Sequence, residues 1–251
     1  MTTRHGLSSP YVTLTLTSLA LRVATTALLS IVHRLLPSFD ASAQHLASVS
    51  SSFEAFVRWD TVYFLTIARD GYAAPHEQRL AFFPALPAVL RFGSDLIARA
   101  SARRPTFEDM VVAGFVATAI ATTASAILLY KLTWTISQSR RFSFATSVLW
   151  LLGPARAVLH AVPYTEPFAA LFTFAGMSAF VLRDRDLSAA ILFACATAFR
   201  AQGAVLGLGF FGWRYILEQP FSSTTTATSR FPIKVGHRDS SPSLVSRARS
   251  S

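Results

Sequence analysis

The stretch Met110–Leu132 reads MVVAGFVATAIATTASAILLYKL, and it decides the class of this protein. Its only charged side chain is Lys131, next to its last residue. About 20 consecutive apolar residues are needed for a helix that crosses the hydrocarbon core of a bilayer. The stretch is that long, so it predicts a helix that spans a membrane.

Five more apolar runs extend this prediction to a multi-pass protein. They cover residues 11–32, 142–162, 167–182, 187–199 and 201–217. Arg22 interrupts the first run, and a charge at that depth is costly unless it faces a bundle interior or a polar partner. The run 187–199 is short for a crossing, so it is expected to be tilted, re-entrant or joined to its neighbour. The predicted fold class is all-α, a multi-pass transmembrane helical bundle.

The composition agrees with this class and excludes several others. Apolar residues make up 52% of the chain and charged residues 14%, with a mean hydropathy of +0.42, whereas soluble domains are about one quarter charged. The net charge of +10 comes from basic residues that flank the apolar runs or follow Glu218, which indicates lipid headgroups and not nucleic acid. One cysteine, Cys195, and six histidines without metal-ligand spacing predict no disulfide, metal site or cofactor.

Basic residues in the short connections predict which side of the membrane each segment faces. Such residues mark the cytosolic side. They occur between the second and third runs and between the fourth and fifth, as Lys131, Arg140, Arg141, Arg183 and Arg185. The long segment after the first run, the turn 160–166 and the turn 199–203 are therefore expected to meet on the opposite, lumenal face.

The same reasoning divides the chain into three parts. Residues 1–10 are a cytosolic N-terminus, and residues 11–217 are a membrane domain with an amphipathic lumenal loop at 34–108. Residues 218–251 are a cytosolic tail, and its basic, Ser/Thr-rich composition predicts disorder. Ala41-Ser42-Ala43 resembles a signal-peptidase site. The apolar run before it is longer than a typical signal core of about 7 to 15 residues, which favours an uncleaved first span.

The loop segment Arg58–Tyr72 reads RWDTVYFLTIARDGY and carries the strongest chemical pattern. Its larger side chains recur at helical spacing, as Trp59, Tyr63, Phe64 and Ile67. This spacing predicts a helix with an apolar face on the membrane and Asp60 beside that face. A carboxylate at the lipid boundary can take a proton from a sugar hydroxyl while a lipid-phosphate sugar donor approaches from the bilayer.

Together with His76 and Ala81-Phe82-Phe83-Pro84, this segment resembles the first lumenal loop of the GPI mannosyltransferase 2 family. Pro163–Phe172 resembles the family's Tyr-Ser/Thr-Glu turn, and Ala196–Gly203 its Arg-Ser-Asn-Gly turn, with Ala201-Gln202 in place of Ser-Asn. The resemblance implies a GT-C fold in the endoplasmic reticulum membrane. It further implies dolichyl phosphate mannose as donor, a GPI precursor glycolipid as acceptor, and α-1,6 transfer of the second mannose with inversion. Membrane lipids and a small membrane subunit are the other partners it implies.

The resemblance also implies roles for individual residues. Asp60 matches the family's loop aspartate and would be the single base that an inverting displacement needs. Arg200, His160 or an arginine of the first loop would support the leaving dolichyl phosphate. Tyr164 and Glu166 would orient the acceptor hydroxyl or hold the loop. The remaining candidates for substrate binding are Trp59, His76 and Gln202.

Each candidate also has a purely structural interpretation. Asp60 could pair with Arg58 or cap its helix. Glu166 could complement a helix dipole, and Arg200 could reach the headgroups. For His160 taken alone, a structural role is slightly favoured. Close helix packing, and not a phosphate cradle, is the expected role of three glycines that no strand precedes, Gly203, Gly207 and Gly209.

Two other functions compete with a transferase. One is a small transporter or channel in which Arg22 and Arg156 line an anion path. The other is a non-catalytic membrane subunit or truncated pseudo-enzyme, because the resemblance covers about residues 11–217 whereas members of the family continue through more spans. The chain is accordingly expected to be a truncated form or a fragment.

Overall fold

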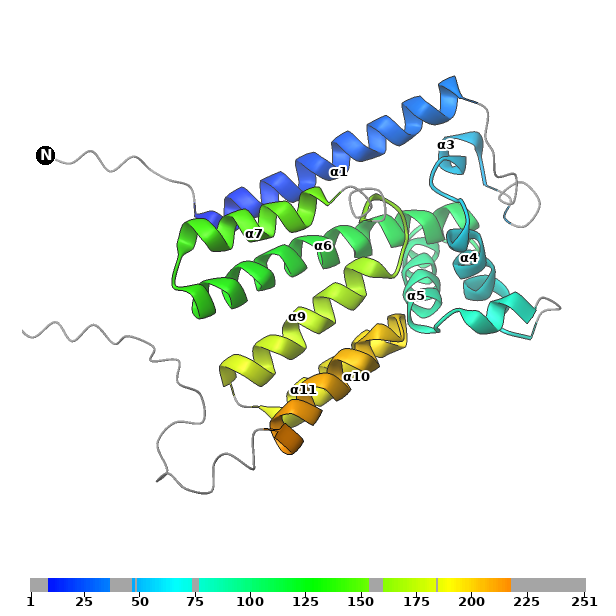
Figure 1. The fold of residues 1–251 in the computed structure, drawn as a ribbon. Coiled ribbons are helices and arrows are strands. Elements are labelled where there is room, and N and C mark those ends of the chain that lie inside the picture. The colour runs from blue at the N-terminus through cyan, green and yellow to red at the C-terminus, as the bar shows by residue number, and fades with distance from the viewer. Residues whose placement is uncertain are drawn as a thin grey trace, which may run out of the picture.

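The computed structural model describes residues 9–36, 47, 49–73, 77–153, 160–183 and 185–217. Every regular element in these ranges is a helix, which confirms the all-α prediction (Figure 1). The elements are α1 Pro10–Leu35, α3 Ser51–Glu54, α4 Asp60–Asp70, the 3₁₀ helix η1 Glu77–Ala81, α5 Ala85–Ala100, α6 Phe107–Ser137, α7 Arg140–Leu152, α9 Glu166–Arg183, α10 Asp186–Phe199, α11 Gln202–Gly212 and the π-helical turn η2 Trp213–Leu217. The predicted tail 218–251 lies outside the described residues, as do residues 1–8 of the predicted N-terminal segment.

Two of the described helices, α1 and α6, are long and apolar enough to cross a membrane. At about 1.5 Å per residue, their 26 and 31 residues exceed the hydrocarbon thickness of about 30 Å. The helices α9 and α10 are apolar but shorter. The third predicted run, 142–162, is wrong as one continuous helix because α7 ends at Leu152. The reason is local: Gly153 precedes Pro154, and the residue before a proline is driven out of the helical region.

The helix α6 is the centre of the arrangement (Figure 1). It packs against α1, α5, α7 and α9, and α10 in turn packs against α9 and α11. Its N-terminus is fixed by a capping box, in which Thr106 accepts from the backbone N–H of Asp109 and the Asp109 carboxylate accepts from the N–H of Thr106. The guanidinium of Arg103 pairs with the same carboxylate. This end of α6 is therefore a rigid base for the segments that precede it.

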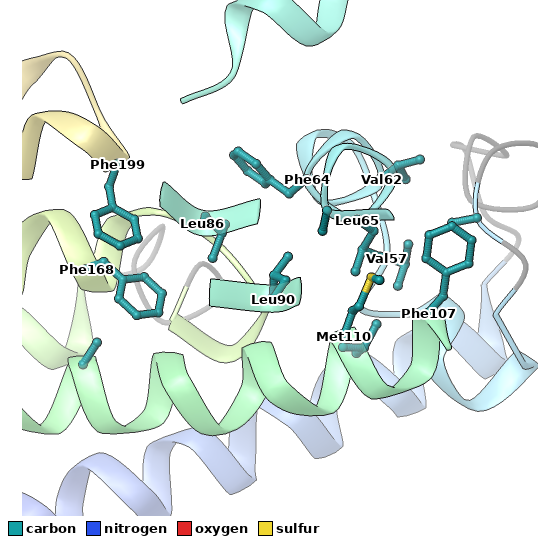
Figure 2. Packing of buried hydrophobic residues seen from close by; sticks show 14 of the residues in the cluster. Val57, Val62, Phe64, Leu65, Leu86, Leu90, Phe107, Met110, Phe168 and Phe199 are labelled. Atoms are coloured by element: carbon teal, nitrogen blue, oxygen red, sulfur yellow. The ribbon is translucent and has the colours of Figure 1, made fainter. Parts of the chain in front are cut away.

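The main buried cluster lies where α4 and α5 meet the first turns of α6, and it extends towards Phe168 and Phe199 (Figure 2). Leu65 from α4, Leu90 from α5 and Val111 from α6 are fully buried in it. Removing one such side chain from water stabilises a fold by about 1.5–3 kcal/mol. The cluster therefore fixes the loop segment on the helical bundle.

The predicted membrane-facing side of α4 is wrong for two of its four residues. Phe64 and Ile67 are only 4% and 3% exposed, because the protein itself covers them, whereas Trp59 is 73% exposed. The ring of Tyr63 stacks on that of Phe82 with centroids 5.1 Å apart. An apolar helix face does not reveal whether it meets lipid or protein, because lipid tails are as apolar as leucine.

Two of the three glycines that predicted close helix packing do pack closely. A Cβ on Gly203 would lie 2.5 Å from the backbone N of Thr197, and one on Gly207 would lie 3.1 Å from Cβ of Phe193. Gly209 has no heavy atom within 4 Å of such a Cβ, so the prediction is wrong there. The closely packed pair lies on the side of α11 that faces α10.

Trp59 has a positive φ directly before α4, with φ 49° and ψ −124°, a backbone region that favours glycine. A residue with a Cβ holds such a conformation at a cost of about 1–3 kcal/mol. We predict that the free energy of unfolding of Trp59→Gly is about 1 kcal/mol higher than that of Trp59→Ala. Both variants lose the indole, and only glycine relieves the backbone strain. Thermal unfolding of the two purified variants measures the difference. A less stable glycine variant would contradict the strain argument.

Candidate functional site

A cleft of about 380 Å³ opens where four segments meet. They are the start of α4, the region around the end of η1, and the turns that precede α9 and α11. The lining residues are Asp60, Phe64, Ala81, Phe82, Phe83, Tyr164, Thr165, Phe199, Arg200, Ala201 and Gln202. The segments singled out by the sequence motifs therefore come together in one cavity.

Asp60 is the first residue of α4, and its carboxylate meets the turn that leads into α9. The hydroxyl of Tyr164 donates a hydrogen bond to Oδ2 of Asp60. Arg58 lies beside Glu54, 4.0 Å away, and beside Nδ1 of His33. The described contacts thus favour a partner for Asp60 inside the cleft over the alternative pairing with Arg58.

Tyr164 is held as a hydrogen-bond donor by its surroundings. Burial raises the pKa of its hydroxyl well above the ordinary value of 10.0, and the hydrogen bond to the Asp60 carboxylate raises this pKa further. The proton therefore stays on Tyr164 throughout the neutral range. The contribution of the Tyr164 hydroxyl to the free energy of unfolding is complete below the pKa of the unfolded chain. It is lost as the pH rises through the higher pKa of the folded chain.

Arg200, which lines the cleft, forms an ion pair with Glu166. Nη1 of Arg200 donates to Glu166 Oε1 and also lies 3.3 Å from the hydroxyl of Thr165. Glu166 is the first residue of α9, where a carboxylate also complements the helix dipole. The pair connects the start of α9 with the junction between α10 and α11.

Aromatic rings form a second, apolar wall of the cleft. Phe64, Phe82, Phe83 and Phe199 all line it. The Phe64 ring meets the Tyr164 ring edge to face at 5.8 Å, and Phe82 is held in place because the Tyr72 hydroxyl donates to its carbonyl oxygen at 2.8 Å. None of these phenylalanines is among the site residues predicted from the sequence. The Ala81-Phe82-Phe83-Pro84 motif was the signal that could have indicated two of them.

Of the predicted site residues that the structure describes, three do not line the cleft: Trp59, His160 and Glu166. His160 is 6% exposed, and its ring packs 4.8 Å from that of Trp150. Trp59 precedes Asp60 but is largely exposed. His76 lies outside the described residues. The structure thus places His160 outside the lining of the cleft, and its role in supporting a phosphate stays a prediction.

The polar groups of the cleft suit a displacement reaction assisted by a base. A carboxylate with one oxygen engaged by Tyr164 keeps a second oxygen for an incoming hydroxyl. A guanidinium carries five N–H donors, so Arg200 can hold Glu166 and still bind an anion. The described residues contain no group of three or more His, Cys, Asp or Glu side chains that could hold a metal ion.

Comparisons with known proteins agree on one family. The model of the family described as mannosyltransferase (PIG-V) matches residues 3–231. The chain is 33% identical over 183 residues to GPI mannosyltransferase 2 of Cryptococcus neoformans, a match covering 72% of this chain and 41% of that protein. It is 30% identical over 199 residues to GPI alpha-1,6-mannosyltransferase 2 of Rattus norvegicus, covering 75% and 39%.

The human GPI alpha-1,6-mannosyltransferase 2 is 31% identical over 152 residues, 61% of this chain and 30% of that protein. The match to each of the first two relatives thus spans about two fifths of the relative's length. No solved structure matches the chain. Because the family model covers most of the sequence, this chain belongs to the mannosyltransferase (PIG-V) family.

Proposed function

We propose that this chain is a mannosyltransferase of the endoplasmic reticulum membrane. It would transfer mannose from dolichyl phosphate mannose to a GPI precursor that already carries one mannose, through an α-1,6 linkage. The observation that carries the proposal is the cleft in which Asp60, Tyr164 and Arg200 meet from three segments. The names of the relatives support the acceptor class and the linkage.

The architecture we propose is a multi-pass bundle of GT-C type, with residues 1–10 and 218–251 in the cytosol and the loop 34–108 in the lumen. It is supported by the apolar helices and by the basic residues of the short connections. Membrane lipids and a small membrane subunit would cover the exposed apolar side of α1. Labelling of Ser101→Cys in a Cys195→Ala background tests the proposed lumenal position of the loop 34–108. A membrane-impermeant maleimide should reach this cysteine only from the lumen.

The reaction would be a single displacement. The free oxygen of the Asp60 carboxylate takes the proton from the acceptor hydroxyl. The hydroxyl oxygen forms a bond to the anomeric carbon of the donor mannose as the bond from that carbon to the phosphate oxygen breaks. The departing dolichyl phosphate keeps the electron pair, and inversion follows because one nucleophile attacks opposite one leaving group.

Arg200 is the cation best placed to support the leaving phosphate. Its ion pair with Glu166 fixes the guanidinium at the edge of the cleft, and charge-assisted hydrogen bonds to phosphate are about twice as strong as neutral ones. Gln202 lines the same edge and would bind a sugar hydroxyl through its amide. The exposed Trp59 would contact the donor lipid or the acceptor from the bilayer side.

A transfer assay tests the proposed function. The purified chain is reconstituted in liposomes with dolichyl phosphate mannose and a synthetic acceptor carrying one mannose. We expect one added mannose that an α-1,6-specific mannosidase removes, and no product with GDP-mannose as the donor. No product from this chain, under conditions in which the rat relative is active, would favour a non-catalytic subunit or pseudo-enzyme.

Replacing Tyr164 by phenylalanine should lower kcat about tenfold while leaving the acceptor KM within about threefold. The change removes one hydrogen bond to Asp60 and keeps the ring that packs on Phe64, and a hydrogen bond to a charged group contributes about 1.5–3 kcal/mol. Initial rates at saturating donor measure the effect.

Because the pKa of Tyr164 is raised, the pH profile of the wild-type transfer rate should show no loss of rate from ionisation of Tyr164 between pH 6 and about pH 9.

A further inference from the structure

Arg22 lies in the middle of α1, far along the sequence from the residues of the cleft. Its guanidinium nevertheless reaches two other parts of the molecule. Nη1 donates to the carbonyl oxygen of His160, where the turn 160–166 begins. Nη2 donates to the carbonyl oxygen of Phe115 at 2.7 Å and to the hydroxyl of Thr118 at 2.8 Å, both on α6.

These contacts occupy N–H donors of Arg22 that would otherwise bind anions, which is the role that a transporter would give this residue. Besides the three hydrogen bonds, Cζ of Arg22 lies 5.5 Å from the centroid of the Phe115 ring. A charged side chain inside an apolar helix is tolerated when it finds polar partners within the protein. The described partners are a carbonyl of the turn and two oxygen atoms of α6, so Arg22 joins three segments.

The turn is held against α6 a second time, three residues later. Pro163 is fully buried. A Cβ on Gly114 would lie 2.6 Å from Cβ of Pro163 and 2.8 Å from Cδ2 of Leu90, so only glycine allows the proline to approach this closely. Tyr164 follows directly and donates to Asp60. The turn is thus fixed at His160 and at Pro163 before it presents the Tyr164 hydroxyl.

We propose that Arg22 is a positioning residue for the transferase site, which fixes the start of the turn 160–166 to α1 and α6 and thereby sets where Tyr164 meets Asp60. This inference rests on the proposed function for its catalytic part. Arg22 is not among the residues that line the cleft, and its described hydrogen bonds go to His160, Phe115 and Thr118. Its effect passes through the backbone of the turn, and a displacement of about 1 Å at a reacting group can cost about 10²-fold in rate.

The side chain has to be arginine for a geometric reason. A planar guanidinium holds its N–H groups in a fixed fork, from which Nη1 reaches the turn and Nη2 reaches α6. The ammonium of lysine is a compact charge that cannot reach the carbonyls of His160 and Phe115 in the same geometry. Arg22→Lys should therefore keep only part of the effect, and Arg22→Met, which has a similar length and no donor, should lose it.

The chain offers a matched control one turn earlier on α1. Ser18 forms a hydrogen bond of 3.0 Å with Thr123, which joins α1 to α6 without involving the turn. Ser18→Ala weakens the same helix pair, so it reports what a merely structural contact between α1 and α6 contributes. Both variants are compared in the full chain, at temperatures below their unfolding transitions.

The first measurement is hydrogen exchange of the backbone amides in residues 160–166, which needs no activity. We expect exchange at least tenfold faster in Arg22→Met and unchanged exchange in Ser18→Ala. Unchanged exchange in Arg22→Met would overturn the anchoring role, whatever the transfer assay gives. Faster exchange in a chain that transfers no mannose would leave the anchor in place and count against the proposed function.

The second measurement is a double-mutant cycle on kcat with Arg22→Met and Tyr164→Phe. If Arg22 acts through the turn, the double variant should have the same kcat as Arg22→Met alone. The reason is that Arg22→Met has already lost the hydrogen bond from Tyr164 to Asp60. Arg22→Lys should recover part of kcat at unchanged acceptor KM. Effects that multiply would show that Arg22 only holds helices together, and would overturn the positioning role.

Discussion

Asp60→Asn should lower kcat about 10³-fold, the largest loss expected from a single substitution in this chain. General base catalysis contributes about 10²–10⁴-fold, and an amide oxygen cannot take a proton from a sugar hydroxyl. Asparagine has nearly the same shape as aspartate and can still accept the hydrogen bond from Tyr164. The loss should therefore lie in kcat, with the KM for donor and acceptor within about threefold of the wild-type values.

Initial rates of mannose transfer, with the thermal midpoint of each variant, measure this prediction. Asp95→Asn is the matched control, because it makes the same chemical change on α5 and Asp95 is not part of the cleft lining. That variant should retain its activity. A kcat for Asp60→Asn within threefold of the wild-type value would exclude Asp60 as the base and leave it a structural group at the start of α4.

Gly203→Ala is expected to have the largest structural effect near the site. The added Cβ would lie 2.5 Å from the amide nitrogen of Thr197 and 2.7 Å from the carbonyl carbon of Ala196. Both atoms belong to the backbone of α10, which cannot turn aside as a flexible side chain does. The junction between α10 and α11 would have to open, and Arg200, whose carbonyl accepts from the N–H of Gly203 at 3.0 Å, would move with it.

We expect Gly203→Ala to lower the free energy of unfolding by about 1–3 kcal/mol, as overpacking usually does, and to lower kcat about 10²-fold through the displacement of Arg200. Gly209→Ala is the control on the same helix, where a Cβ meets no atom within 4 Å. It should be neutral or more stable by up to about 1 kcal/mol, because alanine favours helix. Equal midpoints for the two variants would contradict the close approach.

The helices could be predicted from the sequence because their apolar runs contain almost no charged residues. Met110–Leu132 lies within α6, and the run 187–199 matches α10 to within one residue. The early end of α7 depended on one local feature, Gly153 before Pro154, which hydrophobicity does not reveal. The surroundings of Phe64 could not be predicted either, because lipid and a protein core select the same apolar side chains.

The site was only partly predictable, for a related reason. Asp60, Tyr164 and Arg200 belong to motifs whose segments could be placed on one face from the charges of short loops, and all three line the cleft. His160 belongs to the second of these turns, but its ring packs on Trp150. The direction in which a turn presents each side chain depends on contacts such as that of Gly114 with Pro163, and these join positions far apart in the sequence.

The hydrogen bond between Tyr164 and Asp60 joins residues 104 positions apart. At about 5–20 residues per second, a ribosome delivers the tyrosine roughly 5–20 s after the aspartate, and Arg200 emerges later still. During that interval the aspartate has already been made and no partner yet exists for it. Under the proposed function, competence for chemistry would then arise late in biosynthesis, and a nascent chain halted before Tyr164 would be folded in part and catalytically silent.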